Sequence, residues 1–329
     1  MTHRRLLGLL LATLLTVALL GASPARASGS TAPDPDPETP FAKATPPNND
    51  FPHLPARCAV RKDLIPLTPV RCNLNKFVKS RPTIVLWGDS HAWQLVPALR
   101  DQAAGRGVNL VAYLLGSCPV MVKPMTKAER RKAPDCLKSN AMALDFVKKL
   151  RRDDRDVRVV LATFWQRYLH AIRKQTFGSY YGQMAKIFEK SGPRAFRILG
   201  RMRVGVDVVG QALTVPARAP NCRKGNDPYK CNLPRFKAIR EEKGTRAWVK
   251  ARMRPLARPS YVDINKMCTR RTCYAKVQRT NTFFDVFHIT ASMSRLISYV
   301  FAGTVDRALA GAGSRADDGP SCSLPILCP

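Results

Sequence analysis

A serine that follows a glycine and an aspartate is the first residue of this chain that could perform chemistry. Ser90 stands in Gly88-Asp89-Ser90-His91, directly after the apolar run Thr83–Trp87. A serine at a strand-to-helix turn presents its hydroxyl at the sheet edge, where helix N-terminal N–H groups can face a developing oxyanion. The glycine before it is expected to let the backbone approach a substrate closely. The alternative is that Asp89 or Ser90 only caps the helix.

A histidine with a carboxylate three residues before it is the second candidate. Asp285 and His288 lie near the end of the chain in Phe-Asp-Val-Phe-His. At this spacing the carboxylate can hold the Nδ1–H group of the imidazole, which leaves Nε2 as a base. Serine needs such a base to become a nucleophile. We therefore predict Ser90 as nucleophile, with His288 and Asp285 handling its proton; a surface Asp–His pair ahead of a helix is the alternative.

Apolar runs typical of buried strands alternate with segments of helical periodicity along the body of the chain. Strands alternating with helices indicate a parallel sheet that is covered on both faces. The predicted fold is therefore a three-layer α/β/α domain with a mainly parallel sheet of about five strands. Strands are expected at residues 83–87, 109–115, 157–164, 204–210 and 259–264, and helices at 92–103, 136–150, 180–189, 236–253 and 290–309.

This topology decides which histidine can serve the serine. Ligands of parallel sheets bind at the carboxyl ends of the strands. Ser90 follows the first predicted strand and His288 follows the last, so both are expected at the same edge. The other histidines compete poorly: His53 lies in a predicted linker, His170 has no acid three residues before it, and His91 is expected to point elsewhere.

The first residues of the chain indicate export. Arg4 and Arg5 precede the apolar run Leu6–Leu20, and Ala25-Arg26-Ala27 is a small-x-small cleavage signal. Residues 1–27 are therefore predicted to be a cleaved signal peptide, and the protein to be secreted or associated with the cell envelope. An uncleaved membrane anchor is the alternative, although the run is shorter than the roughly 20 apolar residues of a membrane span.

Composition divides the rest of the chain. Residues 28–56 are rich in proline, aspartate, threonine and asparagine and predict an extended linker. Residues 57–312 are predicted to form the catalytic domain. Residues 313–329 are predicted to be a C-terminal tail with a small disulfide loop.

Ten cysteines, an even number at short separations, indicate disulfides in an exported chain. A metal site is the alternative, but there is no CxxC, and the histidines cluster neither with one another nor with the cysteines. We expect five local bridges and neither metal nor cofactor, although the sequence alone does not prove the connectivity. The expected pairs are Cys58 with Cys72, Cys118 with Cys136, Cys222 with Cys231, Cys268 with Cys273, and Cys322 with Cys328.

The net charge is strongly positive, since 55 Lys and Arg oppose 23 Asp and Glu to give +32. Such a field concentrates anionic partners at the surface. Outside the cell we expect anionic wall polymer or a membrane surface as the partner, and no nucleic acid.

Together these motifs resemble a known family. Gly88-Asp-Ser-His and Asp285-x-x-His288 look like the first and last blocks of the SGNH superfamily, which has a flavodoxin-like fold. The chain is more closely similar to the extracytoplasmic SGNH domain of acyltransferase-3 type O-acyltransferases, over roughly residues 58–310. Further features that match this subgroup are the leading cysteine pair, Gly116-Ser-Cys-Pro119, Leu161-Ala-Thr-Phe-Trp165 with Tyr168, Val209-Gly210 with Pro220-Asn-Cys222, and Cys268 with Cys273.

The resemblance implies an activity. It indicates an O-acyltransferase or esterase that acts on O-acyl groups, O-acetyl being expected, of a cell-envelope polysaccharide through an acyl-serine intermediate. Ser90 would be the nucleophile, His288 the base and Asp285 its orienting acid. The partners would be an acylated glycan and, because no multi-span acyltransferase portion is present, a separate membrane protein that donates the acyl group. The alternative function is a catalytically silent basic module that binds anionic cell-wall polymer.

The chain departs from the family in its oxyanion donors. Family esterases offer an asparagine in a Gly-x-Asn-Asp block, but none follows the third predicted strand, where Trp165 stands instead. The oxyanion would then rely on the N–H groups of Ser90 and Gly116, and a missing donor costs about 10²–10³ in rate. Trp93 and Trp165 are candidates for stacking on a sugar ring, with burial in the core as the alternative.

Overall fold

The computed structural model describes residues 50–59, 65–122, 126–213, 232–278, 280–285 and 287–313. These residues belong to one of the two compact units of the chain, residues 33–329. The predicted signal peptide, the linker up to residue 49 and the tail from residue 314 onward lie outside the described residues. So do the predicted cysteine pairs 222–231 and 322–328.

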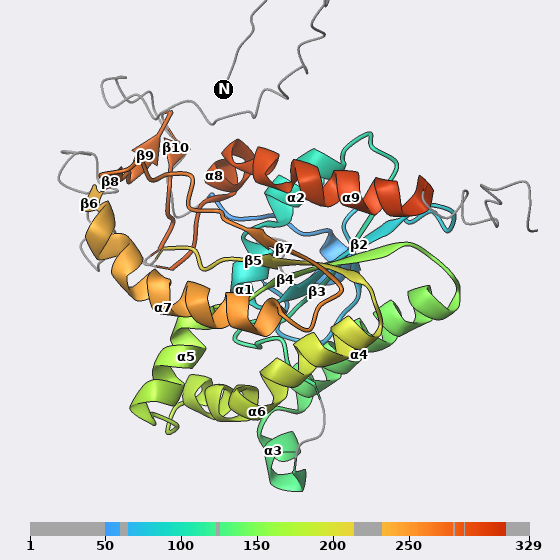
Figure 1. The fold of residues 1–329 in the computed structure, drawn as a ribbon, viewed down its shortest axis with the longest axis horizontal. Coiled ribbons are helices and arrows are strands. Elements are labelled where there is room, and N and C mark those ends of the chain that lie inside the picture. The colour runs from blue at the N-terminus through green and yellow to red at the C-terminus, as the bar shows by residue number, and fades with distance from the viewer. Residues whose placement is uncertain are drawn as a thin grey trace, which may run out of the picture. The chain divides into compact units, whose positions relative to one another are not determined.

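Six strands form the main sheet, in the order β1-β3-β2-β4-β5-β7 (Figure 1). Five of them are parallel, and the short β1 pairs antiparallel with β3 at one edge. The central strands β2, β3 and β5 are buried at every residue, as expected for a sheet covered on both faces. The strands are β1 (Cys72–Asn73), β2 (Thr83–Gly88), β3 (Asn109–Leu114), β4 (Val157–Ala162), β5 (Gly205–Val209) and β7 (Arg258–Val262).

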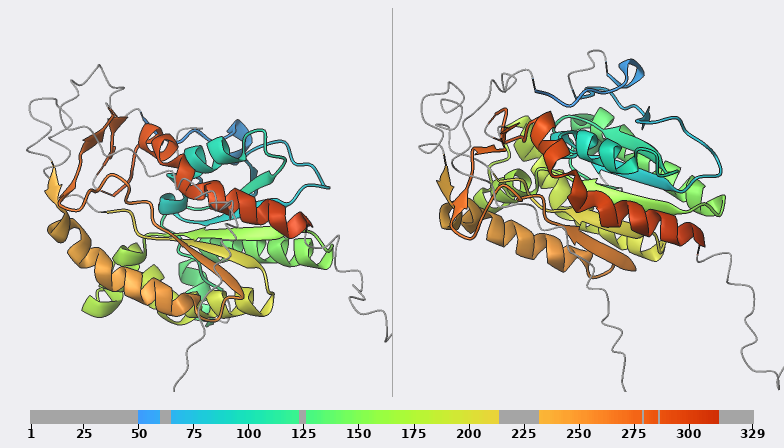
Figure 2. Two further views of the ribbon diagram at one scale, coloured as in Figure 1. Left: turned by 45° about the horizontal axis from the view of Figure 1, so that its top comes forward. Right: turned by 90° about the horizontal axis from the view of Figure 1, so that it is seen from above.

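Helices cover both faces of this sheet, and the views in Figure 2 show the two helical layers on opposite sides. One core, which includes Ile84 and Leu86 of β2, packs beneath α2, α8 and α9; the other, which includes Val85 and Trp87, packs beneath α4 to α7. The first layer is α2 (Val96–Ala103), α8 (Ala291–Leu296), the 3₁₀ helix η5 (Ser298–Phe301) and α9 (Ala302–Gly313). The second is α4 (Pro134–Arg152), α5 (Trp165–Lys174), α6 (Tyr180–Arg201) and α7 (Arg235–Met253). The predicted three-layer α/β/α fold is thereby confirmed.

Shorter elements complete the domain. A small region before the Asp-x-x-His segment contains two short antiparallel pairs, β6 with β8 and β9 with β10. The short elements are η2 (Ala56–Cys58), α1 (Ser90–Trp93), α3 (Lys127–Lys132), β6 (Leu233–Pro234), β8 (Thr272–Cys273), β9 (Lys276–Val277) and β10 (Thr280–Asn281).

The strand order places the end of β2 at a special position. After β2 the chain adds β3 on one side of it and then β4 on the other. The order therefore reverses at β2, and ligands of open α/β sheets bind in the crevice at such a reversal, beyond the carboxyl ends of the strands. Ser90 is the first residue of α1, two residues after the end of β2.

Several element boundaries differ from the sequence predictions. The expected helix 92–103 is two helices, α1 and α2, because Pro97 lies at the start of α2, where its missing N–H is tolerated. The expected strand 157–164 ends at Ala162, and α5 begins at Trp165. The apolar residues between them continue the strand pattern in the sequence, so neither the end of β4 nor the existence of α5 was predicted.

The end of the predicted linker belongs to the domain. Leu54 is buried in the first core, and the Phe51 ring packs edge-on against Phe284 at 5.0 Å. The backbone carbonyl of Asp50 accepts a hydrogen bond from the N–H of Ala291 at the start of α8 (3.0 Å). Residues at the end of the predicted linker therefore pack against the domain that was predicted to begin at residue 57.

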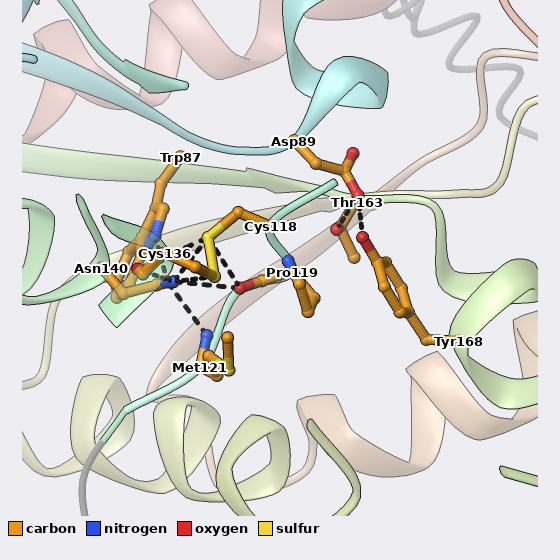
Figure 3. Close-up of a disulfide and its surroundings, with 9 residues drawn as sticks. All are labelled: Trp87, Asp89, Cys118, Pro119, Met121, Cys136, Asn140, Thr163 and Tyr168. Atoms are coloured by element: carbon orange, nitrogen blue, oxygen red, sulfur yellow. Dashed lines mark hydrogen bonds between the residues drawn. A yellow bond between two sulfur atoms is a disulfide. The ribbon is translucent and has the colours of Figure 1, made fainter. Parts of the chain in front are cut away.

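Three disulfides lie within the described residues, and all three match the expected local pairs: Cys58–Cys72, Cys118–Cys136 and Cys268–Cys273. The second joins the segment after β3 to α4 (Figure 3). The amide of Asn140 lies beside it, donates to the carbonyls of Pro119 and Cys136, and accepts from the Trp87 indole N–H (2.8 Å). The loop after β3 is thus held against α4 and against β2.

A buried ion pair joins the neighbouring strands β4 and β5 of the sheet. Arg158 of β4 donates two hydrogen bonds of 2.6 Å to Asp207 of β5, and both side chains are almost fully buried. Arg307 of α9 donates a third, of 3.0 Å. Removing one partner of a buried pair leaves an uncompensated charge.

The first prediction concerns this pair. Asp207→Asn should lower the free energy of unfolding by about 3–5 kcal/mol, because Arg158 would stay buried without a countercharge. Denaturant unfolding followed by circular dichroism measures the change. Asp306→Asn is the matched control, since it removes an ion pair with Arg106 in which the Asp306 side chain is 58% exposed, and exposed pairs contribute at most about 1 kcal/mol. Equal effects of the two substitutions would contradict this account.

Candidate active site

The glycine before the serine has a structural role different from the one predicted. A Cβ atom at Gly88 would overlap the backbone carbonyl oxygen of Ala162 on β4. Gly88 therefore allows the end of β2 to lie close against β4. The close approach of a substrate at this glycine stays a prediction.

Asp89 is a buried carboxylate with four hydrogen-bond donors. Its Oδ1 caps α1 by accepting from the N–H of His91 (2.9 Å). Its Oδ2 accepts from the hydroxyls of Thr163 (2.6 Å) and Tyr168 (3.1 Å) (Figure 3). It also accepts from the N–H of Phe164 (3.0 Å). Burial raises the pKa of Asp89 above its ordinary value of 3.8, although these hydrogen bonds act in the opposite direction. Asp89 thus joins the β2–α1 turn to the segment that follows β4.

Ser90 begins α1 and is partly exposed. Within the described part of the chain, neither its hydroxyl nor its backbone N–H makes a hydrogen bond. Capping of the helix is done by Asp89. The capping alternative therefore applies to Asp89, and Ser90 has both its hydroxyl and its N–H available.

The Asp285–His288 pair has the geometry that its spacing predicted. Nδ1 of His288 lies 2.7 Å from Oδ2 of Asp285. Oδ1 of the same carboxylate accepts from the backbone N–H groups of Phe287 (2.6 Å) and His288 (2.7 Å). Burial on its own would raise the pKa of Asp285, but these hydrogen bonds and the charge of His288 outweigh it, so the pKa lies below 3.8. Asp285 is therefore a carboxylate at neutral pH and orients the imidazole.

The ring of His288 lies against the helix that Ser90 begins. Its centroid is 5.1 Å from that of His91 and 6.5 Å from that of Trp93. The N–H of Ile289 donates to Oε1 of Gln94 (2.9 Å), which ties the segment after His288 to the α1–α2 junction. The two loops from opposite ends of the chain therefore meet. Among the described residues, Nε2 of His288 is buried and has no hydrogen-bond partner, so no hydrogen bond joins it to Ser90.

Gly116 does not fit the role of an oxyanion donor. Its N–H already donates to the backbone carbonyl of Pro66 at 3.1 Å. That carbonyl belongs to a segment whose Ile65 and Leu67 side chains lie against Gly116. The sequence suggested Gly116 because it follows β3, but the hydrogen bond from a distant segment could not be predicted. Of the two N–H groups predicted as oxyanion donors, that of Ser90 is still available.

The two tryptophans considered for sugar stacking are both core residues. Trp165 is 0% exposed, and its indole N–H donates to the carbonyl of Val209 (2.9 Å). Trp93 is 5% exposed and has Phe51 and Phe284 beside its ring. Neither ring offers an open face to a sugar, so the alternative of burial applies to both.

Sequence analysis missed the polar residues near His288. His91 is only 2% exposed; it lies at 4.2 Å from the ring of Phe164 and beside His288, so the expectation that it points away from the site was wrong. Gln94 and Gln211 contact its Nδ1. His91 and Gln94 are three residues apart, a spacing that brings two side chains together on one face of a helix, so this contact could be predicted from the sequence. The contribution of Gln211 was not visible, because it comes from the segment after β5.

Comparison with known proteins adds the family. A family described as SGNH domain, fused to AT3 domains, matches residues 57–303, which is more than half of the chain. The chain belongs to this family. The resemblance inferred from the two motifs is thereby confirmed. The segments that carry these motifs, around Ser90 and His288, are the two that meet at the edge of the sheet.

Other comparisons are more distant. The periplasmic domain of the lipopolysaccharide acetyltransferase of Salmonella ser. Paratyphi A is a similar solved structure, with a TM-score of 0.42 and 16% identity over 69% of this chain and 84% of that one. At this TM-score the similarity does not bear on activity. A search of curated proteins gave no match. Of the helices in the described residues, none has the length and apolar character needed to span a membrane.

The second prediction concerns Asp89. Asp89→Asn should lower the free energy of unfolding by about 1–3 kcal/mol, because an amide group cannot accept from all four buried donors and leaves at least one unpaired. Tyr168→Phe removes only one of the donors and should cost less. Denaturant unfolding shows which variant loses more free energy of unfolding. A larger loss in Tyr168→Phe than in Asp89→Asn would contradict the assignment of Asp89 as the common acceptor.

Proposed function

We propose that this SGNH domain is a serine-dependent acyl esterase or O-acyltransferase that acts on O-acyl groups, chiefly O-acetyl, of a cell-envelope polysaccharide. The observation that carries the proposal is the 2.7 Å contact between Asp285 and His288, placed beside the helix turn that Ser90 begins. Family membership supports it, because the SGNH domains of this family are fused to AT3, acyltransferase-type, domains.

In the proposed first half-reaction, Oγ of Ser90 attacks the carbonyl carbon of the acyl ester. The Oγ–H proton passes to Nε2 of His288, and the carbonyl π electrons move to the oxygen, which becomes an oxyanion. The oxyanion then reforms the carbonyl and expels the alcohol, which takes the proton from His288. Hydrogen bonds between nucleophile and base are commonly longer before substrate binds, so a Ser90–His288 hydrogen bond is expected to form in the complex.

In the second half-reaction, a hydroxyl attacks the acyl group on Ser90. His288 accepts the proton of that hydroxyl and returns a proton to Oγ when the acyl–serine bond breaks. Water as the attacking group gives an esterase, and a glycan hydroxyl gives a transferase. Asp285 stays ionised throughout and stabilises the imidazolium of His288, as the low pKa of Asp285 allows.

The proposed location rests on the disulfides, and the proposed polymer substrate rests on the net charge. Three disulfides in the described residues are typical of proteins that fold in an oxidising compartment. A net charge of +32 favours approach to an anionic polymer or an anionic membrane surface. We therefore propose that the domain works outside the cytoplasm, on an acylated glycan of the cell envelope.

The third prediction tests the nucleophile. Ser90→Ala should abolish hydrolysis of p-nitrophenyl acetate while leaving the unfolding midpoint unchanged, because the Ser90 hydroxyl makes no hydrogen bond within the described structure and the backbone carbonyl, which accepts from the N–H of Gln94, is kept in alanine. A fluorophosphonate probe should label the native protein on Ser90, as peptide mass spectrometry can show. Turnover by Ser90→Ala at the native rate would exclude the mechanism. Binding to anionic polymer that weakens steeply with salt, without labelling of Ser90, would instead favour a catalytically silent binding module.

The fourth prediction tests the orienting acid. Asp285→Asn should lower kcat on the order of 10⁴-fold, because the amide no longer stabilises the productive tautomer and the imidazolium. Steady-state kinetics measure the loss. Asp145→Asn is the control, since Asp145 lies on α4 and, among the described residues, forms an ion pair only with the exposed Lys148. A loss of less than tenfold in Asp285→Asn would argue against Asp285 as the partner of the base.

A further inference from the structure

Three polar atoms without a hydrogen-bond partner gather beside Ser90. Among the described residues, five buried side-chain nitrogen or oxygen atoms have no partner, and three of them are ring nitrogens: Nε2 of His91, Nε1 of Trp93 and Nε2 of His288. The rings of His91 and Trp93 both lie against that of His288. Buried polar groups are nearly always paired, so unpaired ring nitrogens at a candidate active site have hydrogen-bonding capacity that a bound substrate can use.

The position of the hydrogen on His91 follows from two glutamines. Nδ1 of His91 lies 3.3 Å from Nε2 of Gln94 and 3.4 Å from Nε2 of Gln211. The orientation of each amide is set at its oxygen, which accepts a backbone N–H: that of Ile289 for Gln94 (2.9 Å) and that of Gln166 for Gln211 (3.1 Å). Both glutamines therefore present NH₂ groups to Nδ1.

An imidazole nitrogen that faces two donors must be an acceptor. Nδ1 of His91 consequently carries no hydrogen, and in the neutral ring the hydrogen is on Nε2. Burial holds the pKa of His91 well below its ordinary 6.5, and the charge of His288 lowers it further. His91 thus stays neutral when His288 takes up a proton, and its Nε2–H is a donor that no described residue accepts.

We propose that Nε2–H of His91 donates a hydrogen bond to the carbonyl oxygen of the acyl group at Ser90, as the second oxyanion donor beside the backbone N–H of Ser90. The inference rests on the proposed function. It follows from the place of His91, which is the next residue after Ser90 and lies 5.1 Å, ring to ring, from the proposed base. The N–H of Gly116 is already bonded to Pro66 and does not supply this donor.

Two substitutions of similar polarity separate the donor from the rest of the side chain. In His91→Asn the amide reaches only as far as Nδ1, so it can still accept from Gln94 and Gln211 but places no donor at the distal end of the ring. In His91→Gln the amide reaches the distal position. His91→Asn should lower kcat for p-nitrophenyl acetate about 10²–10³-fold with KM changed only a few-fold, the usual effect of losing one oxyanion donor. His91→Gln should retain at least tenfold more of the native rate.

The step affected distinguishes an oxyanion donor from a group that binds the attacking hydroxyl. Both the formation and the breakdown of acyl-Ser90 pass through an oxyanion, so His91→Asn should slow the two steps alike in pre-steady-state kinetics. A variant that forms acyl-Ser90 at the native rate and only hydrolyses it slowly would overturn the inference. Native kinetics in His91→Asn would overturn it as well.

A measurement on the unsubstituted protein avoids the risk that a buried substitution prevents folding. With ¹⁵N-labelled histidine, the NMR spectrum should show His91 as the neutral Nε2–H form, unchanged between about pH 5 and pH 8, a range in which an ordinary histidine changes its charge. A phosphonate adduct on Ser90, which imitates the tetrahedral oxyanion, should shift the His91 Nε2–H proton downfield. An Nδ1–H form, or no shift in the adduct, would overturn the inference.

The inference and the proposed function fail in different ways. If Ser90 is labelled by the phosphonate and Ser90→Ala is inactive, but His91 shows no response, only the role of His91 is excluded. If Ser90 is not labelled and Ser90→Ala turns over ester as fast as the native protein, the acyl mechanism itself is excluded, and with it the donor role of His91.

Discussion

The candidate site depends on one buried carboxylate at the end of the central strand. Asp89 is surrounded by four donors, three of which come from Thr163, Phe164 and Tyr168 beyond the neighbouring strand. Burial makes its charged form costly, as the raised pKa shows, and the hydrogen bonds offset that cost. Its other oxygen caps the helix of Ser90. A single side chain thus places the serine, and orders the segment that carries Phe164 against the ring of His91.

The two imidazoles beside Ser90 have different surroundings. His91 is enclosed by aromatic and amide groups that disfavour a positive ring. His288 has the carboxylate of Asp285 at 2.7 Å from its Nδ1. Two adjacent imidazoles, with centroids 5.1 Å apart, therefore have different chemical capacities although they are side chains of the same type. Such a separation is what an active site needs when one ring must exchange a proton and the other must keep its hydrogen.

Much of the fold was predictable because buried parallel strands and amphipathic helices leave strong local patterns, as in Thr83–Gly88. The Asp285–His288 pair was predictable for the same reason, since both partners lie within one turn of chain. Long-range hydrogen bonds were not predictable. The N–H of Gly116 is taken by a carbonyl fifty residues earlier, and the tautomer of His91 depends on Gln211, 120 residues away. Residue types and spacing contain no signal for such contacts.

The high charge of the chain and the chemistry of the site act on different parts of the proposed reaction. The rings beside that of His288 are those of His91, Trp93 and Phe284, and the carboxylate of Asp285 is paired with its Nδ1. At physiological ionic strength a charge on the surface is screened over about 8 Å, so it acts on the encounter with an anionic polymer. The chemical step would then depend on short-range hydrogen bonds, which salt hardly affects. The encounter with the polymer would depend on the electrostatic field of the protein, which salt weakens.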